Sequence, residues 1–140
     1  MLPRSTSPDA SRPTEFEDSR SFSQGVVDTF ADLTGDHNFL HKGGQASYGP
    51  FEGPIVPGAL IMGHFAKILG TQFPGPGTVY LGQELKFNQP LYVDQRARFL
   101  VRMQRSHDSK PIHWLETRCL DFDDPSRVLC EGVAVVKFKW

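Results

Sequence analysis

The second half of the chain alternates apolar and polar residues, which is the pattern of β-strands with one face in a core and the other in solvent. The alternation occupies four segments rich in β-branched and aromatic residues, at residues 78–87, 96–105, 112–121 and 128–140. Near the end of the chain, Ala134 and Val136 fall on one face of such a strand, and Lys137 falls on the other. Turn-forming residues separate the segments, so the pattern predicts consecutive antiparallel strands with one apolar face.

Ahead of these strands lies a segment that is apolar on nearly every side. Residues 58–69 read GALIMGHFAKIL and carry one formal charge, at Lys67. A helix of this composition belongs in a protein core and not on its surface. Pro57 suits the start of such a helix, and Gly70 suits its C-terminal cap. The sequence therefore predicts an α+β protein, in which an antiparallel sheet packs around one buried helix.

The first half of the chain is less regular. Residues 22–30 predict a short strand or helix, and the glycines and prolines of residues 43–54 predict a long surface loop, which in a small domain usually serves a site. Residues 1–14 are rich in serine, proline and arginine; they fit a disordered tail better than an organelle-targeting leader, and they lack the apolar core of a secretory signal. We predict a disordered tail over residues 1–15 and one domain over residues 16–140.

Composition narrows the classes of function. A chain of 140 residues with 39% hydrophobic content suits one core, and its formal net charge of −1 lacks the positive field that nucleic-acid binding requires. No apolar stretch approaches the ~20 residues of a membrane span, so we expect no membrane partner and a cytoplasmic protein. Cys119 and Cys130 fall in consecutive strands, and we predict two reduced core residues because two cysteines do not make a disulfide framework.

The residues that carry chemistry lie in the first half of the chain, where Asp36 and His41 flank a turn. An imidazole exchanges a proton near neutral pH, and a neighbouring carboxylate orients the ring or shares a water molecule with it. The offset of five residues does not align two side chains on a helix, so they meet only if the segment bends. Gly35 and Asn38 supply the bend, because both tolerate unusual backbone angles. Taken alone, Asp36 also fits a turn or cap residue.

The same segment resembles the signature of the MaoC-like, (R)-specific enoyl-CoA hydratase (hydratase 2) family. The matching positions are Phe30, Thr34, Gly35, Asp36, Asn38, Leu40, His41 and Ala46. One position departs, since Phe39 stands where the family usually has proline. The resemblance implies a hotdog fold, (R)-specific hydration or dehydration of an acyl thioester of coenzyme A or acyl carrier protein, no metal or redox cofactor, and a homodimer.

The resemblance also implies a set of site residues. Asp36 and His41 would share the reacting water, and the backbone amide of Gly58, at the positive end of the buried helix, would hold the thioester oxyanion. Pro57 replaces the histidine or alanine common in the family, although it leaves the next amide free. The predicted substrate contacts are Asn38, Phe39, Pro57, Tyr80 and Leu81, and Phe87 and Leu91 are further candidates for an acyl tunnel.

Two other functions fit parts of the pattern. A hotdog thioesterase would use a carboxylate to direct water to the carbonyl carbon, and a partner subunit would bind the thioester without catalysis. Retention of both Asp36 and His41 favours the hydratase. Four arginines, Arg96, Arg98, Arg102 and Arg105, suit either coenzyme A phosphates or the solvated face of a strand, and we expect the latter.

The remaining histidines have no metal-site spacing. His64, inside the apolar segment, is predicted to be packed and hydrogen-bonded. His37, His107 and His113 are predicted to lie in loops or on the surface.

Overall fold

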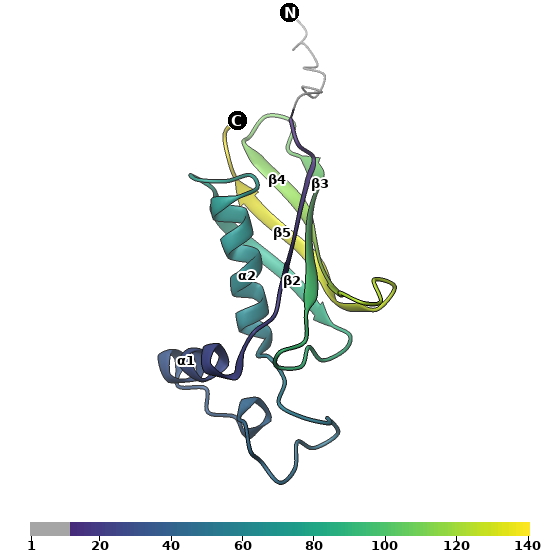
Figure 1. Ribbon diagram of the computed structural model, residues 1–140. Helices are drawn as coiled ribbons and strands as arrows, with labels where there is room; N and C mark the ends of the chain where they lie inside the picture. Colours follow the sequence, from purple (N-terminus) through teal and green to yellow (C-terminus); the bar gives the residue numbers. More distant parts are fainter. Residues whose placement is uncertain (1–11) are drawn as a thin grey trace, which may run out of the picture.

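The computed structural model describes residues 12–140, so most of the predicted tail lies outside the described residues (Figure 1). In chain order the elements are β1 (Glu15–Arg20), α1 (Gln24–Thr34), a 3-10 turn (Phe39–His41), α2 (Gly58–Thr71), β2 (Val79–Phe87), β3 (Ala97–Ser106), β4 (Ile112–Asp121) and β5 (Val128–Lys137). The strands form one five-stranded sheet in the order β1-β3-β4-β5-β2, and all neighbours are antiparallel. The four predicted strands are therefore confirmed, with the last one ending at Lys137.

The sequence analysis did not predict β1. This strand reads EFEDSR, and Phe16 is its one apolar residue, so alternation gives almost no signal. Its place comes from pairing with β3, where Glu15 lies opposite Arg102 and Phe16 lies opposite Val101. The strand therefore forms one edge of the sheet through long-range contacts that a local pattern does not contain.

The segment after β1 is the helix α1 and not a strand. Its N-cap is Ser23, whose hydroxyl accepts a hydrogen bond from the Val26 amide at 3.2 Å. Val27 and Ala31 are its buried side chains. The helix ends at Gly35, which adopts a left-handed conformation with φ of 78°.

The helix α2 packs against one face of the sheet, as predicted (Figure 1). Phe65 packs edge-to-face with Phe99 of β3, with ring centroids 5.4 Å apart. The prediction that Gly70 caps the helix is wrong, because the helix continues to Thr71 and the Gln72 amide still bonds to the Ile68 carbonyl at 2.8 Å. No left-handed residue is needed at that end, and the turn to β2 follows at residues 75–77.

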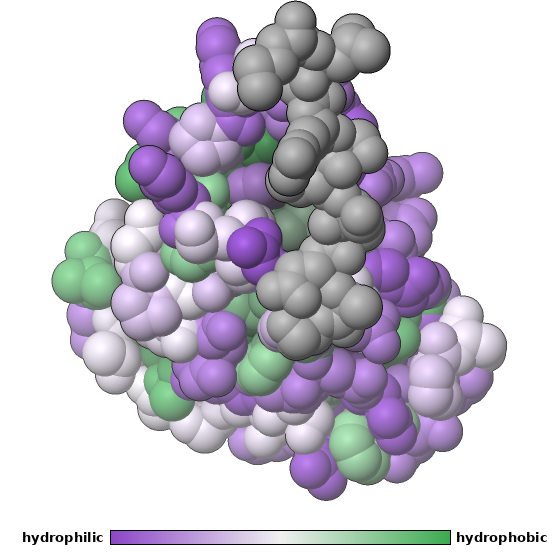
Figure 2. Space-filling model, turned by 90° about the horizontal axis from the view of Figure 1, so that it is seen from above, coloured by the Kyte–Doolittle hydropathy of each residue, from purple (hydrophilic) through white to green (hydrophobic). Residues whose placement is uncertain are grey.

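One side of α2 remains in solvent in the single chain. Ile61, Phe65 and Ile68 are buried, whereas Met62 and Lys67 are exposed. The prediction of a fully buried helix is therefore correct for its sheet side only. On the face shown in Figure 2, hydrophilic residues predominate and hydrophobic residues are scattered among them.

The buried polar groups confirm one histidine prediction and contradict another. His64 is buried and its Nε2 lies 3.0 Å from a carboxylate oxygen of Asp18. His113 was expected in a loop or on the surface, and this is wrong. It is a buried β4 residue whose ring nitrogens lie 2.7 Å from the Ser106 hydroxyl and 2.9 Å from the Phe138 carbonyl. Neither partner is a neighbour in the chain, and Phe138 is 25 positions away, so the local pattern does not show that the ring nitrogens have partners.

The two cysteines are core residues, as predicted. Cys119 and Cys130 are free and buried, and they lie opposite each other on β4 and β5. Burial raises the pKa of the Cys130 thiol to about 12 and raises that of Cys119 further. Both thiols are therefore protonated and unreactive at neutral pH.

Stability is expected to fall as the pH is lowered through about 6.5, partly because of His64. Burial lowers the pKa of His64, the nearby Arg20 and Lys67 act in the same direction, and the Asp18 hydrogen bond opposes them only in part. The unfolded chain therefore binds more protons than the folded one in this range, and folding loses free energy as the pH drops.

Urea unfolding at pH 7.5 and pH 5.5 measures this loss. The His64→Gln variant, whose amide nitrogen can take the place of Nε2 and still donate a hydrogen bond to Asp18, should lose less stability between these pH values than the wild type. His107→Asn, in an exposed turn, is the control and should behave as the wild type. Equal losses in all three proteins would rule out His64 as the source.

Candidate active site

A series of hydrogen bonds between residues close in sequence shapes the loop that follows α1. The Asp36 amide donates to the Thr34 hydroxyl at 3.2 Å, and the Asn38 amide donates to Oδ1 of Asp36 at 3.2 Å. The Leu40 amide then donates to Oδ1 of Asn38 at 3.1 Å, which starts the 3-10 turn. Side chains of this kind satisfy nearby amides and favour turns over regular structure. The signature residues therefore build their own bend directly after Gly35.

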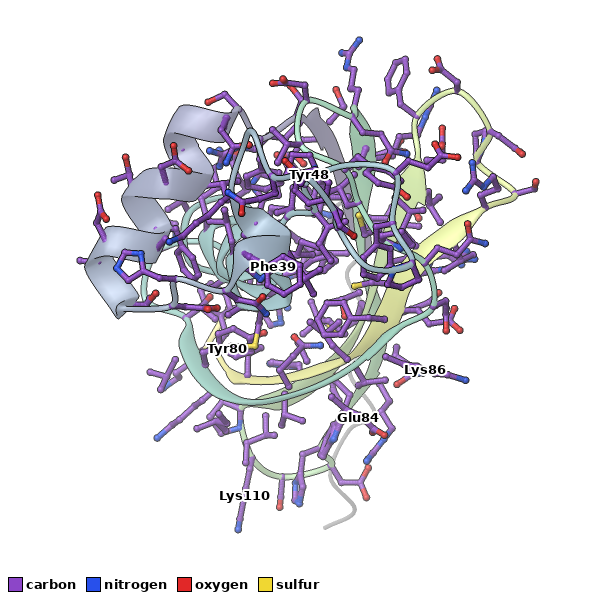
Figure 3. The ribbon with its side chains drawn as sticks, turned by 90° about the horizontal axis from the view of Figure 1, so that it is seen from below. Phe39, Tyr48, Tyr80, Glu84, Lys86 and Lys110 are labelled. Atoms are coloured by element: carbon purple, nitrogen blue, oxygen red, sulfur yellow. The ribbon has the colours of Figure 1, made fainter. Side chains whose placement is uncertain are left out.

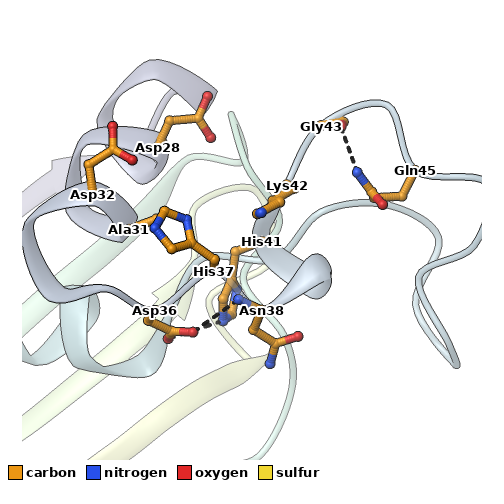
Figure 4. Close-up of a pocket in the computed structure, with 10 residues that line it drawn as sticks. All are labelled: Asp28, Ala31, Asp32, Asp36, His37, Asn38, His41, Lys42, Gly43 and Gln45. Carbon is orange, nitrogen blue, oxygen red and sulfur yellow. Dashed lines mark hydrogen bonds and ion pairs between the residues drawn. The ribbon is translucent and has the colours of Figure 1, made fainter.

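The bend brings Asp36 and His41 together, as the sequence analysis expected (Figure 4). Oδ2 of Asp36 lies 4.0 Å from Nε2 of His41. The side chain of His41 is 12% exposed and that of Asp36 is 48% exposed. A separation of 4.0 Å is too long for a direct hydrogen bond and suits two groups that hold one water molecule between them.

A backbone carbonyl fixes the orientation of the His41 ring. Nδ1 of His41 lies 2.7 Å from the Ile55 carbonyl, which can only accept a hydrogen bond. Nδ1 must therefore carry the proton, and in the neutral ring the lone pair belongs to Nε2. This lone pair faces Asp36, so the arrangement presents a proton acceptor to the shared water.

Gln24 is a residue of this site that the sequence analysis missed. From the first turn of α1, its amide nitrogen donates to the His41 carbonyl at 2.7 Å and to the Asp28 carboxylate at 2.9 Å. It therefore ties the helix to the loop that holds the histidine. A Cβ atom at Gly43 would lie 3.4 Å from this side chain, so the loop passes it closely. No sequence signal marks Gln24, because the contact spans 17 positions.

Two pockets meet at His41. The first is polar and measures about 380 Å³; it is lined by Asp28, Ala31, Asp32, Asp36, His37, Asn38, His41, Lys42, Gly43 and Gln45 (Figure 4). The second is mainly apolar and measures about 360 Å³; it is lined by His41, Phe51, Ile55, Val56, Gly58, Ile61, Phe87, Asn88, Gln89, Pro90 and Leu91. The Asp36–His41 pair thus has a polar pocket on one side and an apolar pocket on the other.

The first turn of α2 lies in the wall of the apolar pocket. Gly58 begins the helix, and its amide has no acceptor one turn earlier. Pro57, the N-cap, is buried, and its carbonyl accepts the amides of Leu60 and Ile61. Figure 1 shows α1 and the loop gathered beside this end of α2. The structure therefore places Gly58 and His41 in the same cavity, as the predicted oxyanion role requires.

The other predicted substrate contacts fall in different places. Asn38 lines the polar pocket, whereas the other four line neither of the two pockets described above: Phe39, Pro57, Tyr80 and Leu81. Phe39 and Leu81 are half-exposed. Tyr80 packs against the core and bonds to Gln83, and burial raises its pKa to about 12.

One face of β2 is turned toward the helices and the other is turned away from them. Figure 3 shows Tyr80 on the side of β2 that faces the helices, and Glu84 and Lys86 on the opposite side. The backbone register shifts between Tyr80 and Gly82, so the alternation restarts there and Leu81 turns outward. Because Tyr80 and Leu81 are neighbours on one strand, their side chains face opposite sides and only one of them can face the helices.

The four arginines lie on the outer side of the sheet and meet neighbouring strands, as expected. Arg98 and Arg102 pair with Glu17 and Glu15 of β1, at 3.3 Å and 3.4 Å. Arg96 stacks on Phe122 and Arg105 stacks on Trp114. None of the four lines either pocket.

Comparison with known proteins identifies the family. Residues 5–119 match the family model described as MaoC like domain. The chain belongs to this family. It is 38% identical over 120 residues to an (R)-specific enoyl-CoA hydratase of Aeromonas caviae, covering 85% of this chain and 88% of that protein. It is 31% identical to a 3-hydroxybutyryl-CoA dehydratase of Methylorubrum extorquens, covering 84% of this chain and 74% of that one.

A solved structure gives the same result for the fold of this MaoC-like protein. The (R)-hydratase of A. caviae involved in PHA biosynthesis superposes with a TM-score of 0.84 at 34% identity, covering 94% of this chain and all of the other. The fold is therefore the hotdog fold that the sequence resemblance implied. Within the described residues, no helix of this MaoC-like protein is long and apolar enough to cross a membrane.

Proposed function

We propose that this MaoC-like protein is an (R)-specific hydratase and dehydratase, a lyase that interconverts 2-enoyl and (R)-3-hydroxyacyl thioesters. The observation that carries the proposal is the position of the Asp36–His41 pair, where a polar pocket meets an apolar one. A reaction that adds water to an apolar acyl chain needs this combination. The names of the hydratase and dehydratase relatives support the same reaction.

In this mechanism the water molecule donates one hydrogen to Oδ2 of Asp36 and the other to Nε2 of His41. Its oxygen attacks the β-carbon of the enoyl group while His41 takes the proton. The electrons of the double bond move onto the thioester oxygen, and the protonated ring then delivers the proton to the α-carbon. Dehydration follows the same steps in reverse, so no metal or redox cofactor is required.

The developing oxyanion needs a donor, which we assign to the Gly58 amide. The first turn of α2 combines a free N–H group with the positive end of the helix dipole. Such a donor is worth roughly 3 kcal/mol of transition-state stabilisation. The apolar pocket beside it would hold the acyl chain, with the coenzyme A or carrier-protein arm outside. Asn38 remains a predicted substrate contact because it lines the polar pocket. Pro57 lines neither pocket, so we propose that it serves the site by starting the helix and not by touching the substrate.

Incubation with crotonyl-CoA tests the proposal directly. Hydration removes the absorbance of the conjugated enoyl group without releasing a thiol, and chiral chromatography of the product should show the (R)-3-hydroxy acid. Release of free coenzyme A would instead identify a thioesterase. Binding of crotonyl-CoA without either change would identify a non-catalytic partner subunit.

A homodimer is expected, because the chain leaves apolar surface next to an unpaired sheet edge. β2 is an edge strand, and its side chains Val79 and Leu81 are exposed together with Met62 of α2. Light scattering after gel filtration should give about twice the 15.7 kDa of one chain. A monomer mass at micromolar concentration would contradict this expectation.

The two buried free thiols support a reducing compartment such as the cytoplasm.

A further inference from the structure

The ring of Phe87 covers the first turn of α2. A Cβ atom at Gly58 would lie 2.6 Å from Cζ and 2.9 Å from Cε1 of this ring. The tip of the ring therefore rests on the Cα atom of Gly58, directly beside the amide assigned to the oxyanion. Only glycine leaves room for this contact.

Phe87 is held there by the backbone and not by burial of its side chain. It ends β2 opposite Cys130, and the next two amides, of Asn88 and Gln89, both donate to the Leu129 carbonyl at 2.9 Å and 3.1 Å. The ring itself is 51% exposed. About half of the residue is exposed in the single chain, so the ring remains accessible to a molecule bound in the pocket.

The pocket has a closed floor and an open mouth. Val56, Ile61 and Leu91 are buried and form the floor, whereas Phe87 stands at the exposed mouth. A carbonyl oxygen that accepts a hydrogen bond from the Gly58 amide lies about 2.9 Å from its nitrogen. The ring tip rests beside the Cα atom bonded to this nitrogen, so it is within reach of the carbonyl carbon and the α-carbon of a thioester bound there.

We infer that Phe87 is a specificity-determining residue that excludes substituents on the α-carbon of the acyl group. This inference rests on the proposed hydratase function. An unbranched 2-enoyl group has one hydrogen at the α-carbon and passes beside the ring. A 2-methyl-2-enoyl group would place its methyl in the volume that the ring occupies.

Crotonyl-CoA and 2-methylcrotonyl-CoA (tigloyl-CoA) differ by this methyl group alone and serve as the probes. In Phe87→Ala and Phe87→Leu, the ratio of kcat/KM for the branched thioester to that for the unbranched one should rise about 10-fold or more, which is the usual effect of one methyl group in a tight pocket. Leu33→Ala is the control, because Leu33 is an 83% exposed apolar residue that lines neither pocket. Its ratio should equal that of the wild type.

The outcomes separate the inference from the proposed function. Wild-type hydration of crotonyl-CoA with an unchanged ratio in both Phe87 variants would overturn the role of Phe87 and leave the hydratase intact. No turnover of crotonyl-CoA by the wild type would overturn both. Thermal unfolding of each variant checks that the fold is kept, and the leucine variant retains an apolar side chain if the alanine variant does not fold.

Discussion

Replacing Asp36 with asparagine is expected to lower kcat/KM for crotonyl-CoA by at least ~100-fold while the fold is kept, which is the usual scale for an acid/base group. Asparagine keeps an oxygen in the Oδ1 position, so the hydrogen bond from the Asn38 amide can persist and hold the bend. The variant removes the negative charge and the second acceptor that faces His41. The loss should therefore appear mainly in kcat.

Steady-state kinetics of the Asp36→Asn protein measure the loss of kcat/KM, and thermal unfolding checks that the fold is kept. Asp108→Asn is the control, because Asp108 is an exposed aspartate in the turn between β3 and β4 and lines neither pocket. It should keep the activity of the wild type. Full activity in the Asp36 variant would mean that the carboxylate is only a turn residue.

The parts of the fold that a sequence pattern predicts are those determined by neighbours in the chain. The alternation of β3, β4 and β5 and the apolar face of α2 are visible locally, and these elements are where the sequence analysis placed them. The strand β1 was missed because its stability comes from β3, more than 70 positions away, and not from its own apolar residues. His113 was misplaced for the same reason, since the Phe138 carbonyl that satisfies it is 25 positions away.

The candidate site likewise combines residues that the local sequence reveals with contacts that only the fold creates. Asp36, Asn38 and His41 were found because they lie close together in the chain and match the family signature. Hydrogen bonds between residues two positions apart then build their turn. The contacts that complete the site span much greater distances: Gln24 reaches the His41 carbonyl over 17 positions, and Phe87 reaches Gly58 over a whole helix and strand. A sequence motif therefore shows which groups react, and the fold shows what positions them and what limits their substrate.

Replacing His41 with alanine is expected to lower kcat/KM for crotonyl-CoA by at least ~100-fold, as for Asp36, because it removes the proton acceptor of the proposed reaction. It also leaves the Ile55 carbonyl without its 2.7 Å partner, so a stability measurement must accompany the kinetics. His107→Ala, in an exposed turn, is the control and should retain full activity.

The double variant, Asp36→Asn with His41→Ala, tests whether the two groups act on one water molecule. If they share it, removing the first already disables the reaction, and the double variant should be about as inactive as the worse single variant. If the two losses multiply instead, to ~10,000-fold or more, the groups act independently. That result would contradict the shared water even though both single variants had behaved as expected.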